Sequence, residues 1–143
     1  MAKIWLLQEG VLSGLWIEAI MKKRVLLVED HPDTIDVMSL ELEVLGYEVT
    51  VATNGLEAVE MATSAPPDLI VMDIILPKLD GLTASARIRR NPKTRQIPIL
   101  AATALCGDLD RANCLASGCN DYIVKPFTHR QLGAHIDRLL KDA

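Results

Sequence analysis

Four short apolar runs and one alternating segment, separated by stretches of helical periodicity, form the pattern of hydrophobic and polar positions beyond residue 22. Runs rich in Val, Ile and Leu are typical of buried parallel strands, and strict alternation is typical of a half-buried strand. The predicted strands are 24–28, 47–52, 69–72, 97–102 and 121–124. The predicted helices, in the same order, are 32–45, 56–61, 82–90, 108–117 and 128–140. This alternation predicts one α/β domain built on a parallel sheet.

Proline and glycine residues mark several of these boundaries. Pro32 suits the first turn of its helix, Gly46 suits the end of the same helix, and Gly118 is expected to cap the fourth helix. Asp80-Gly81 is interpreted as turn chemistry, with Gly81 permitting a backbone conformation that other residues resist. The loop after the third strand is therefore expected to be irregular.

Four of the predicted strands end on residues that can bind a metal ion or a phosphoryl group. Glu29 and Asp30 follow the first strand, Asp73 the third, Thr103 the fourth and Lys125 the fifth. In open parallel sheets, ligands bind at the carboxyl ends of the strands. Three carboxylates, a hydroxyl and an ammonium group are therefore expected to meet at one edge of the sheet and to form a functional site.

The expected carboxylates suit Mg²⁺, which binds oxygen ligands in octahedral geometry and keeps several waters. Asp30 and Asp73 could supply two carboxylates, with Glu29 reaching the ion directly or through water. The backbone carbonyl of Ile75 could add another oxygen. Three carboxylates packed together repel one another unless a cation offsets their charge. The arrangement therefore implies a metal ion, with Lys125 as a second positive charge.

The same residues suit phosphoryl transfer to a carboxylate. An aspartate beside Mg²⁺ can attack phosphorus and form an aspartyl phosphate, and it needs no general base because it is already ionised at neutral pH. The transferring phosphoryl group carries three equatorial oxygens whose charge must be compensated. Mg²⁺, the Lys125 ammonium and the Thr103 hydroxyl would give one partner to each, with Asp73 as the acceptor.

The chain from residue 22 to residue 141 resembles the receiver domain of two-component response regulators, the family that includes the bacterial chemotaxis regulator. The resemblance covers about five-sixths of the chain, and its motifs lie at strand ends in the family's order. They are Glu29-Asp30, the segment 73–81 around the acceptor, Thr103-Ala104, Tyr122 and Lys125-Pro126-Phe127. The resemblance implies a doubly wound, flavodoxin-like sheet of five parallel strands in the order 2-1-3-4-5, with five helices.

By this resemblance, Asp73 takes a phosphoryl group, in the presence of Mg²⁺, from the phosphohistidine of a histidine kinase or phosphotransfer protein. The domain is then a signalling phosphoacceptor rather than an enzyme, although it assists its own phosphorylation and dephosphorylation. Thr103 and Tyr122 couple phosphorylation to a change at the surface formed by the fourth helix, fifth strand and fifth helix. Lys125 joins Pro126 through a cis peptide.

Three positions depart from common family patterns. The first acidic residue is Glu29 where many members have Asp, which adds reach and favours a water-mediated metal contact. Ile75 and Leu105 stand at the positions whose side chains, in the family, flank the phosphoryl group and influence its hydrolysis. Because two apolar groups offer an attacking water no hydrogen bond, we expect the phosphorylated state to be long-lived.

Composition limits which partners the chain is expected to bind and in which cellular compartment it is expected to lie. The chain has 143 residues with a net charge of −4 and a sequence pI of about 5.3, so there is no electrostatic case for direct nucleic-acid binding. The three cysteines match no zinc or redox spacing and are interpreted as reduced thiols of a cytoplasmic protein. No segment is long and apolar enough to be expected to span a membrane.

The first 21 residues do not belong to the strand–helix pattern. Both tryptophans and several leucines lie there, but polar residues interrupt every apolar run. We interpret 1–21 as an N-terminal extension, either a docking helix or an upstream start-site artefact, and 22–143 as the receiver domain. Because almost nothing follows residue 141, the signal is expected to leave through contacts with a downstream protein target. A dimer that forms on phosphorylation is one possible form of such a contact.

Other function classes fit less well. A phosphatase of the haloacid-dehalogenase type needs a second Asp two residues after the nucleophile, where this chain has Ile75. A nucleotide-binding module needs a glycine-rich loop after the first strand, where this chain has residues Glu29 to Pro32. Three receiver-like roles stay open as alternatives: a phosphorelay shuttle, a fragment of a hybrid kinase and an interaction module that is never phosphorylated.

Overall fold

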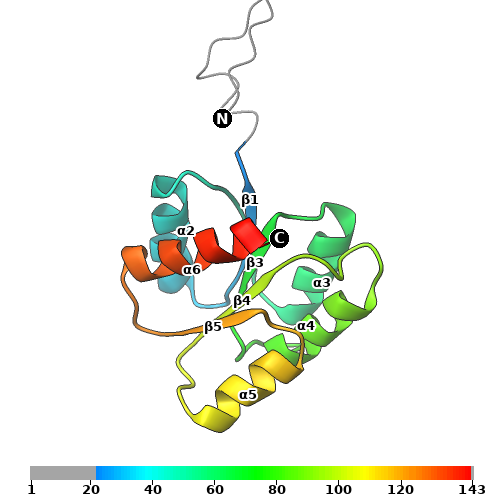
Figure 1. Cartoon of the computed structure of the whole chain (residues 1–143). Helices are drawn as coiled ribbons and strands as arrows, with labels where there is room; N and C mark the ends of the chain where they lie inside the picture. The colour runs from blue at the N-terminus through cyan, green and yellow to red at the C-terminus, as the bar shows by residue number, and fades with distance from the viewer. Residues whose placement is uncertain (1–21, 143) are drawn as a thin grey trace, which may run out of the picture.

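The computed structural model describes residues 22–142, and the predicted extension over residues 1–21 lies outside the described residues. Strands and helices alternate along the described chain (Figure 1). The strands are β1 (Arg24–Val28), β2 (Glu48–Ala52), β3 (Leu69–Met72), β4 (Ile99–Thr103) and β5 (Asp121–Val124). The helices are α2 (Pro32–Val44), α3 (Gly55–Ser64), α4 (Gly81–Arg90), α5 (Asp108–Ala116) and α6 (His129–Asp142).

The five strands form one parallel sheet in the order β2-β1-β3-β4-β5. The predicted doubly wound, flavodoxin-like fold with this strand order is therefore confirmed. Backbone hydrogen bonds continue the sheet past the strand ends, since Asp73 N donates to Val28 O at 2.9 Å and Lys125 N donates to Thr103 O at 2.9 Å. This continuation fixes the residues that follow the strands in register with one another.

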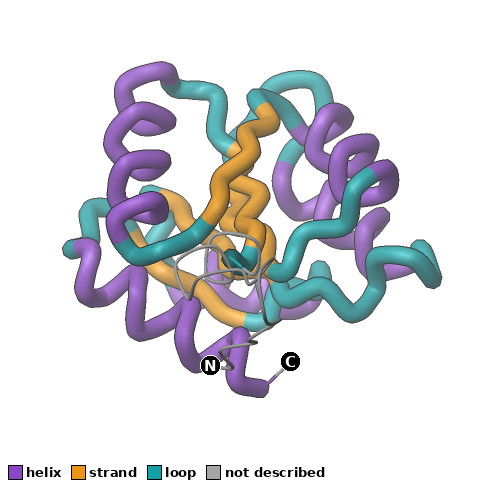
Figure 2. The backbone as a smooth tube through the Cα atoms, turned by 90° about the horizontal axis from the view of Figure 1, so that it is seen from above, coloured by secondary structure: helices purple, strands orange, loops and turns teal. Residues whose placement is uncertain are grey.

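Helices cover both faces of the sheet, as the view from above shows (Figure 2). Alternate strand residues point to opposite faces, so Leu26 and Val28 belong to one core and Val25 and Leu27 to the other. The first core is completed by buried residues of α3, α4 and α5, namely Ala58, Ala62, Ala84, Ile88 and Cys114. The second is completed by buried residues of α2 and α6, namely Met38, Leu42, Leu132 and Ile136. Because both faces are packed, ligands can reach the sheet only at its edges.

The predicted boundaries agree with the structure within a few residues. β1, β3 and β5 have the predicted limits, whereas β4 begins at Ile99 instead of residue 97. Ile97 and Pro98 are buried like strand residues, but proline has no N–H to donate to a sheet. Gly46 and Gly118 follow α2 and α5 with positive φ angles of 99° and 107°, as expected of residues that end helices.

The reason predicted for Gly81 was wrong. Its φ is not positive, and the positive φ in this loop belongs to Lys78 at 64°. Gly81 is required instead by a close approach, because a Cβ atom here would lie 2.7 Å from Ile74 Cα and closer still to the carbonyl oxygen of Asp73. Its N–H donates to Ile74 O at 2.8 Å. The start of α4 is therefore packed directly on the backbone that carries Asp73.

Two observations bear on environment. All three cysteines are free thiols, with Cys106 exposed and Cys114 and Cys119 buried. Within residues 22–142, no helix combines the length and the hydrophobicity that crossing a membrane requires.

Candidate functional site

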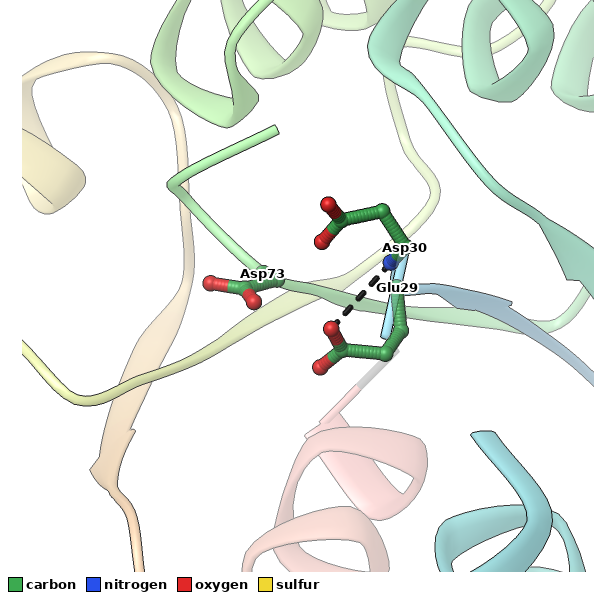
Figure 3. Close-up of side chains that lie close together, drawn as sticks. All are labelled: Glu29, Asp30 and Asp73. Atoms are coloured by element: carbon green, nitrogen blue, oxygen red, sulfur yellow. Dashed lines mark hydrogen bonds between the residues drawn. The ribbon is translucent and has the colours of Figure 1, made fainter. Parts of the chain in front are cut away.

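Three carboxylates meet at the carboxyl edge of the sheet (Figure 3). Glu29 and Asp30 follow β1, and Asp73 follows the adjacent strand β3. One oxygen from each side chain lies within 4.8 Å of the others. Glu29 is buried, Asp73 is partly buried and Asp30 is exposed, so the cluster opens to solvent on the side of the two aspartates. The sequence placed these three residues together correctly.

Asp73 lies at the centre of the site and contacts two hydrogen-bond donors. The backbone N–H of Ile75 donates to its Oδ1 at 3.2 Å, and the Lys125 ammonium donates to its Oδ2 at 3.3 Å. Burial raises the pKa of Asp73, the Lys125 charge lowers it, and the Glu29 charge raises it again, with a net upward shift. A further cation at this position would therefore stabilise the ionised carboxylate.

Lys125 links Asp73 to Glu29. Its Nζ lies 2.5 Å from Glu29 Oε1 and 3.3 Å from Asp73 Oδ2, and its peptide bond to Pro126 is cis. Burial by itself lowers the pKa of Lys125, but the hydrogen bond to Glu29 and the charges of both carboxylates outweigh it and raise that pKa. Lys125 therefore stays charged although it is partly buried.

The second carboxylate oxygen of Glu29 is also engaged. Oε2 accepts hydrogen bonds from the backbone N–H groups of Asp30 at 3.1 Å and of His31 at 3.2 Å. Both N–H groups belong to residues that precede α2, so Glu29 fixes the chain at the point where it leaves β1 and enters the helix. The bond between Glu29 and Lys125, which are 96 residues apart, was not predicted from the sequence.

Thr103 and Tyr122 lie on β4 and β5, the two strands that follow β3 in the sheet. Thr103 is fully buried, and its hydroxyl accepts a hydrogen bond from Leu105 N at 3.3 Å. Tyr122 pairs with Ala101 across the two strands and is only 8% exposed. Its hydroxyl is buried and, within the described part of the chain, has no hydrogen-bond partner. Tyr122 is therefore already turned inward in this structure.

The donor set fits Mg²⁺. Mg²⁺ requires oxygen ligands and space for several bound waters. Asp30 and Asp73 meet both requirements, because their carboxylates lie where the cluster opens to solvent. The backbone of Ile75 lies next to the Asp73 carboxylate, as its N–H contact shows, whereas its side chain is 61% exposed and points away from the core. Among residues 22–142, the cluster consists of carboxylates alone, without a nitrogen or sulfur ligand, which favours Mg²⁺ over softer metals.

Comparison with known proteins identifies the family. A model described as the response regulator receiver domain matches residues 25–137. The DNA-binding dual master transcriptional regulator RpaA of Synechocystis sp. is 39% identical over 118 residues, which are 82% of this chain and 49% of that protein. The alkaline phosphatase synthesis transcriptional regulatory protein PhoP of Bacillus subtilis is 36% identical over 121 residues, 85% of this chain and 50% of that protein. The chain thus spans about half the length of these relatives.

A solved structure resembles this chain in fold and in sequence. The receiver domain of the sensor histidine kinase PA1611 from Pseudomonas aeruginosa PAO1 is 41% identical, with a TM-score of 0.80. The match covers 84% of this chain and 98% of that one, and that structure has a magnesium ion coordinated in its active site cleft.

Proposed function

The chain belongs to the response regulator receiver domain family, and we propose that Asp73 accepts a phosphoryl group from the phosphohistidine of a histidine kinase or phosphotransfer protein. The observation that carries this proposal is the position of Asp73, which lies between Lys125 and two further carboxylates at the open edge of the sheet. The domain acts as a phosphoacceptor that switches a signal, rather than as an enzyme that turns over a substrate. Its free thiols suit the reducing cytoplasm.

The transfer is a displacement at phosphorus. A carboxylate oxygen of Asp73 attacks, a new phosphorus–oxygen bond forms, and the phosphorus–nitrogen bond of the phosphohistidine breaks. The electron pair of that bond stays on the imidazole nitrogen, which leaves and takes up a proton. Asp73 needs no base because it enters the reaction as a carboxylate. The Lys125 ammonium and the buried Thr103 hydroxyl would each compensate charge on one phosphoryl oxygen.

Mg²⁺ would be held by Asp30 and Asp73, with the backbone carbonyl of Ile75 as a third ligand and Glu29 nearby. When bound, it supplies positive charge to the remaining phosphoryl oxygen and brings the acceptor and the donor's phosphoryl group together. Asp30, which is exposed, would keep the ion accessible to water and to the incoming group.

The donor protein would approach over α2. Val37, Leu40 and Val44 form an exposed apolar stripe on this helix, being 57%, 64% and 74% exposed. A groove of about 330 Å³ lies between the N-terminal part of α2 and the segment Lys125-Pro126-Phe127. A donor protein bound at this groove would have its phosphohistidine close to Asp73, and it would contact the apolar stripe of α2.

Leu40→Glu tests that approach. It should slow phosphorylation by a protein donor about tenfold or more and leave labelling by a small acyl phosphate unchanged, because the small donor needs no docking surface. Leu109→Glu on α5, where Leu109 is 73% exposed, is the matched control and should affect neither reaction. Equal transfer rates in both variants would exclude α2 as the docking face.

The signal would leave through the face formed by α5, β5 and α6, which contains Tyr122 and the exposed residues Arg111 and Arg130. The net charge of −4 gives no electrostatic attraction to the phosphate backbone of nucleic acid, so we propose that the target of this face is a protein.

Substitution of the acceptor tests the proposed function. Asp73→Asn keeps the side-chain shape but removes the charged nucleophile, so it should take up less than one-hundredth of the wild-type label from a phosphohistidine donor or an acyl phosphate. Labelling of the wild type should require Mg²⁺ and stop with a chelator. Asp142→Asn, at the exposed end of α6, should label normally. Normal labelling of Asp73→Asn would show that the acceptor has been assigned wrongly.

A further inference from the structure

Both oxygens of the Glu29 carboxylate are already engaged within the protein. Oε1 lies 2.5 Å from the Lys125 ammonium, and Oε2 accepts two backbone N–H groups that precede α2. The side chain is only 3% exposed, whereas that of Lys125 is 22% exposed. A carboxylate fixed at both ends in this way has no free oxygen directed toward solvent, where Mg²⁺ would keep its waters.

We propose that Glu29 is a positioning residue that holds the Lys125 ammonium beside Asp73, and that it is not a direct ligand of Mg²⁺. This inference rests on the proposed function of the site. It also gives a reason for glutamate at this position, because the extra methylene relative to aspartate extends the carboxylate from the end of β1 to the lysine that follows β5.

The distances indicate what this arrangement achieves. The ammonium lies 0.8 Å nearer to Glu29 than to Asp73, so Glu29 carries the closer ion pair. Without Glu29, the nearest remaining partner for the same ammonium is Asp73, the nucleophile and metal ligand. A lysine paired closely with Asp73 would compete with both the phosphoryl group and Mg²⁺. Glu29 therefore keeps the acceptor available while the positive charge stays within reach.

The rate and metal dependence of labelling separate the two roles of Glu29. In Glu29→Gln, we expect the labelling rate at saturating Mg²⁺ to fall about tenfold while the Mg²⁺ concentration for half-maximal rate changes less than threefold. Glu29→Asp keeps the charge but shortens the reach to Lys125, so it should recover only part of the rate. In a Lys125→Met background, Glu29→Gln should cause no further loss, because its effect passes through Lys125. A metal ligand would behave differently, with a much higher Mg²⁺ requirement in either background.

A second readout does not depend on phosphorylation. Nitrogen-15 NMR of the lysine side chains should show Lys125 ammonium protons that are protected from exchange in metal-free wild type. They should exchange faster in Glu29→Gln, because the remaining partner, Asp73, is 13% exposed whereas Glu29 is 3% exposed. Glu43→Gln, on the exposed face of α2, is the control and should retain the protection. Thermal melts would confirm that each variant is folded.

The outcomes are distinguishable. The inference is overturned if Glu29→Gln raises the half-maximal Mg²⁺ concentration more than threefold, keeps the wild-type plateau rate, or leaves the ammonium protection unchanged. If wild type takes up no label at all, the proposed function fails instead, and the ammonium protection alone still decides whether Glu29 holds Lys125.

Discussion

Gly81→Ala should disable the acceptor from a position outside the site. Gly81 begins α4, and its backbone N–H donates to Ile74 O at 2.8 Å. A Cβ atom added here would lie 2.7 Å from Ile74 Cα and would also meet the carbonyl oxygen of Asp73. These neighbours are backbone atoms, which cannot move aside by a change of rotamer. Either the start of α4 or the segment that carries Asp73 must therefore shift.

The size of the shift follows from the geometry. The added carbon is about 0.7 Å short of the 3.4 Å at which ordinary contact begins at Ile74 Cα, so the backbone must move by at least that much. Overpacking of this kind costs about 1–3 kcal/mol of stability. A misplacement near 1 Å in a reacting group reduces rate about 100-fold. We expect Gly81→Ala to be folded but to label at Asp73 about 10- to 100-fold more slowly than wild type.

The assay is labelling by an acyl phosphate at saturating Mg²⁺, together with a urea unfolding curve. Gly133→Ala on α6 is the matched control, since its added Cβ would lie 3.2 Å from a Leu45 methyl group, which is the flexible end of a side chain. The control should label at the wild-type rate. Wild-type rate and stability in Gly81→Ala would refute the argument that close packing at this glycine positions the acceptor.

Three further predictions follow from the site and the fold. Asp30→Ala should lower Mg²⁺ affinity more than tenfold by calorimetric titration, and an unchanged affinity would exclude Asp30 as a ligand. A beryllofluoride phosphate mimic should move Thr103 toward the phosphoryl position and shift amide resonances on the face of α5, β5 and α6; shifts confined to the acidic cluster would instead favour a phosphate shuttle. Arg89→Met should lower the free energy of unfolding in urea by about 2–3 kcal/mol, because this half-buried guanidinium donates hydrogen bonds to the loops before β4 and β5. The control Arg90→Met, at an exposed position, should lower it little. Equal unfolding midpoints for the two variants would contradict this prediction.

The fold was predictable because its signals are local. Runs such as residues 25–28 and 69–72 are apolar throughout, which distinguishes strands buried on both faces from the amphipathic helices between them. The meeting of Asp30, Asp73 and Lys125 followed from topology alone, since all parallel strands present their carboxyl ends at one edge.

What the sequence missed depends on distances between side chains. The hydrogen bonds of Glu29 to Lys125 and to two backbone N–H groups depend on rotamers that no spacing along the chain encodes. Gly81 was expected to adopt an unusual φ angle. It is required instead because a side chain at this position would collide with the backbone of Asp73 and Ile74. Tyr122 was predicted to couple phosphorylation to a change at the surface, but no pattern in the sequence indicated that the packing of the first core already encloses its side chain.

The most direct test of the central claim is to identify the phosphorylated residue itself. Wild-type protein should be incubated with a phosphohistidine donor and Mg²⁺, and the acyl phosphate trapped by borohydride reduction, which converts a phosphorylated aspartate to homoserine. Peptide mass spectrometry should then find homoserine at position 73 and at no other aspartate, and none when Mg²⁺ is chelated. Homoserine at another position, or none at position 73 in protein that has taken up label, would contradict the account.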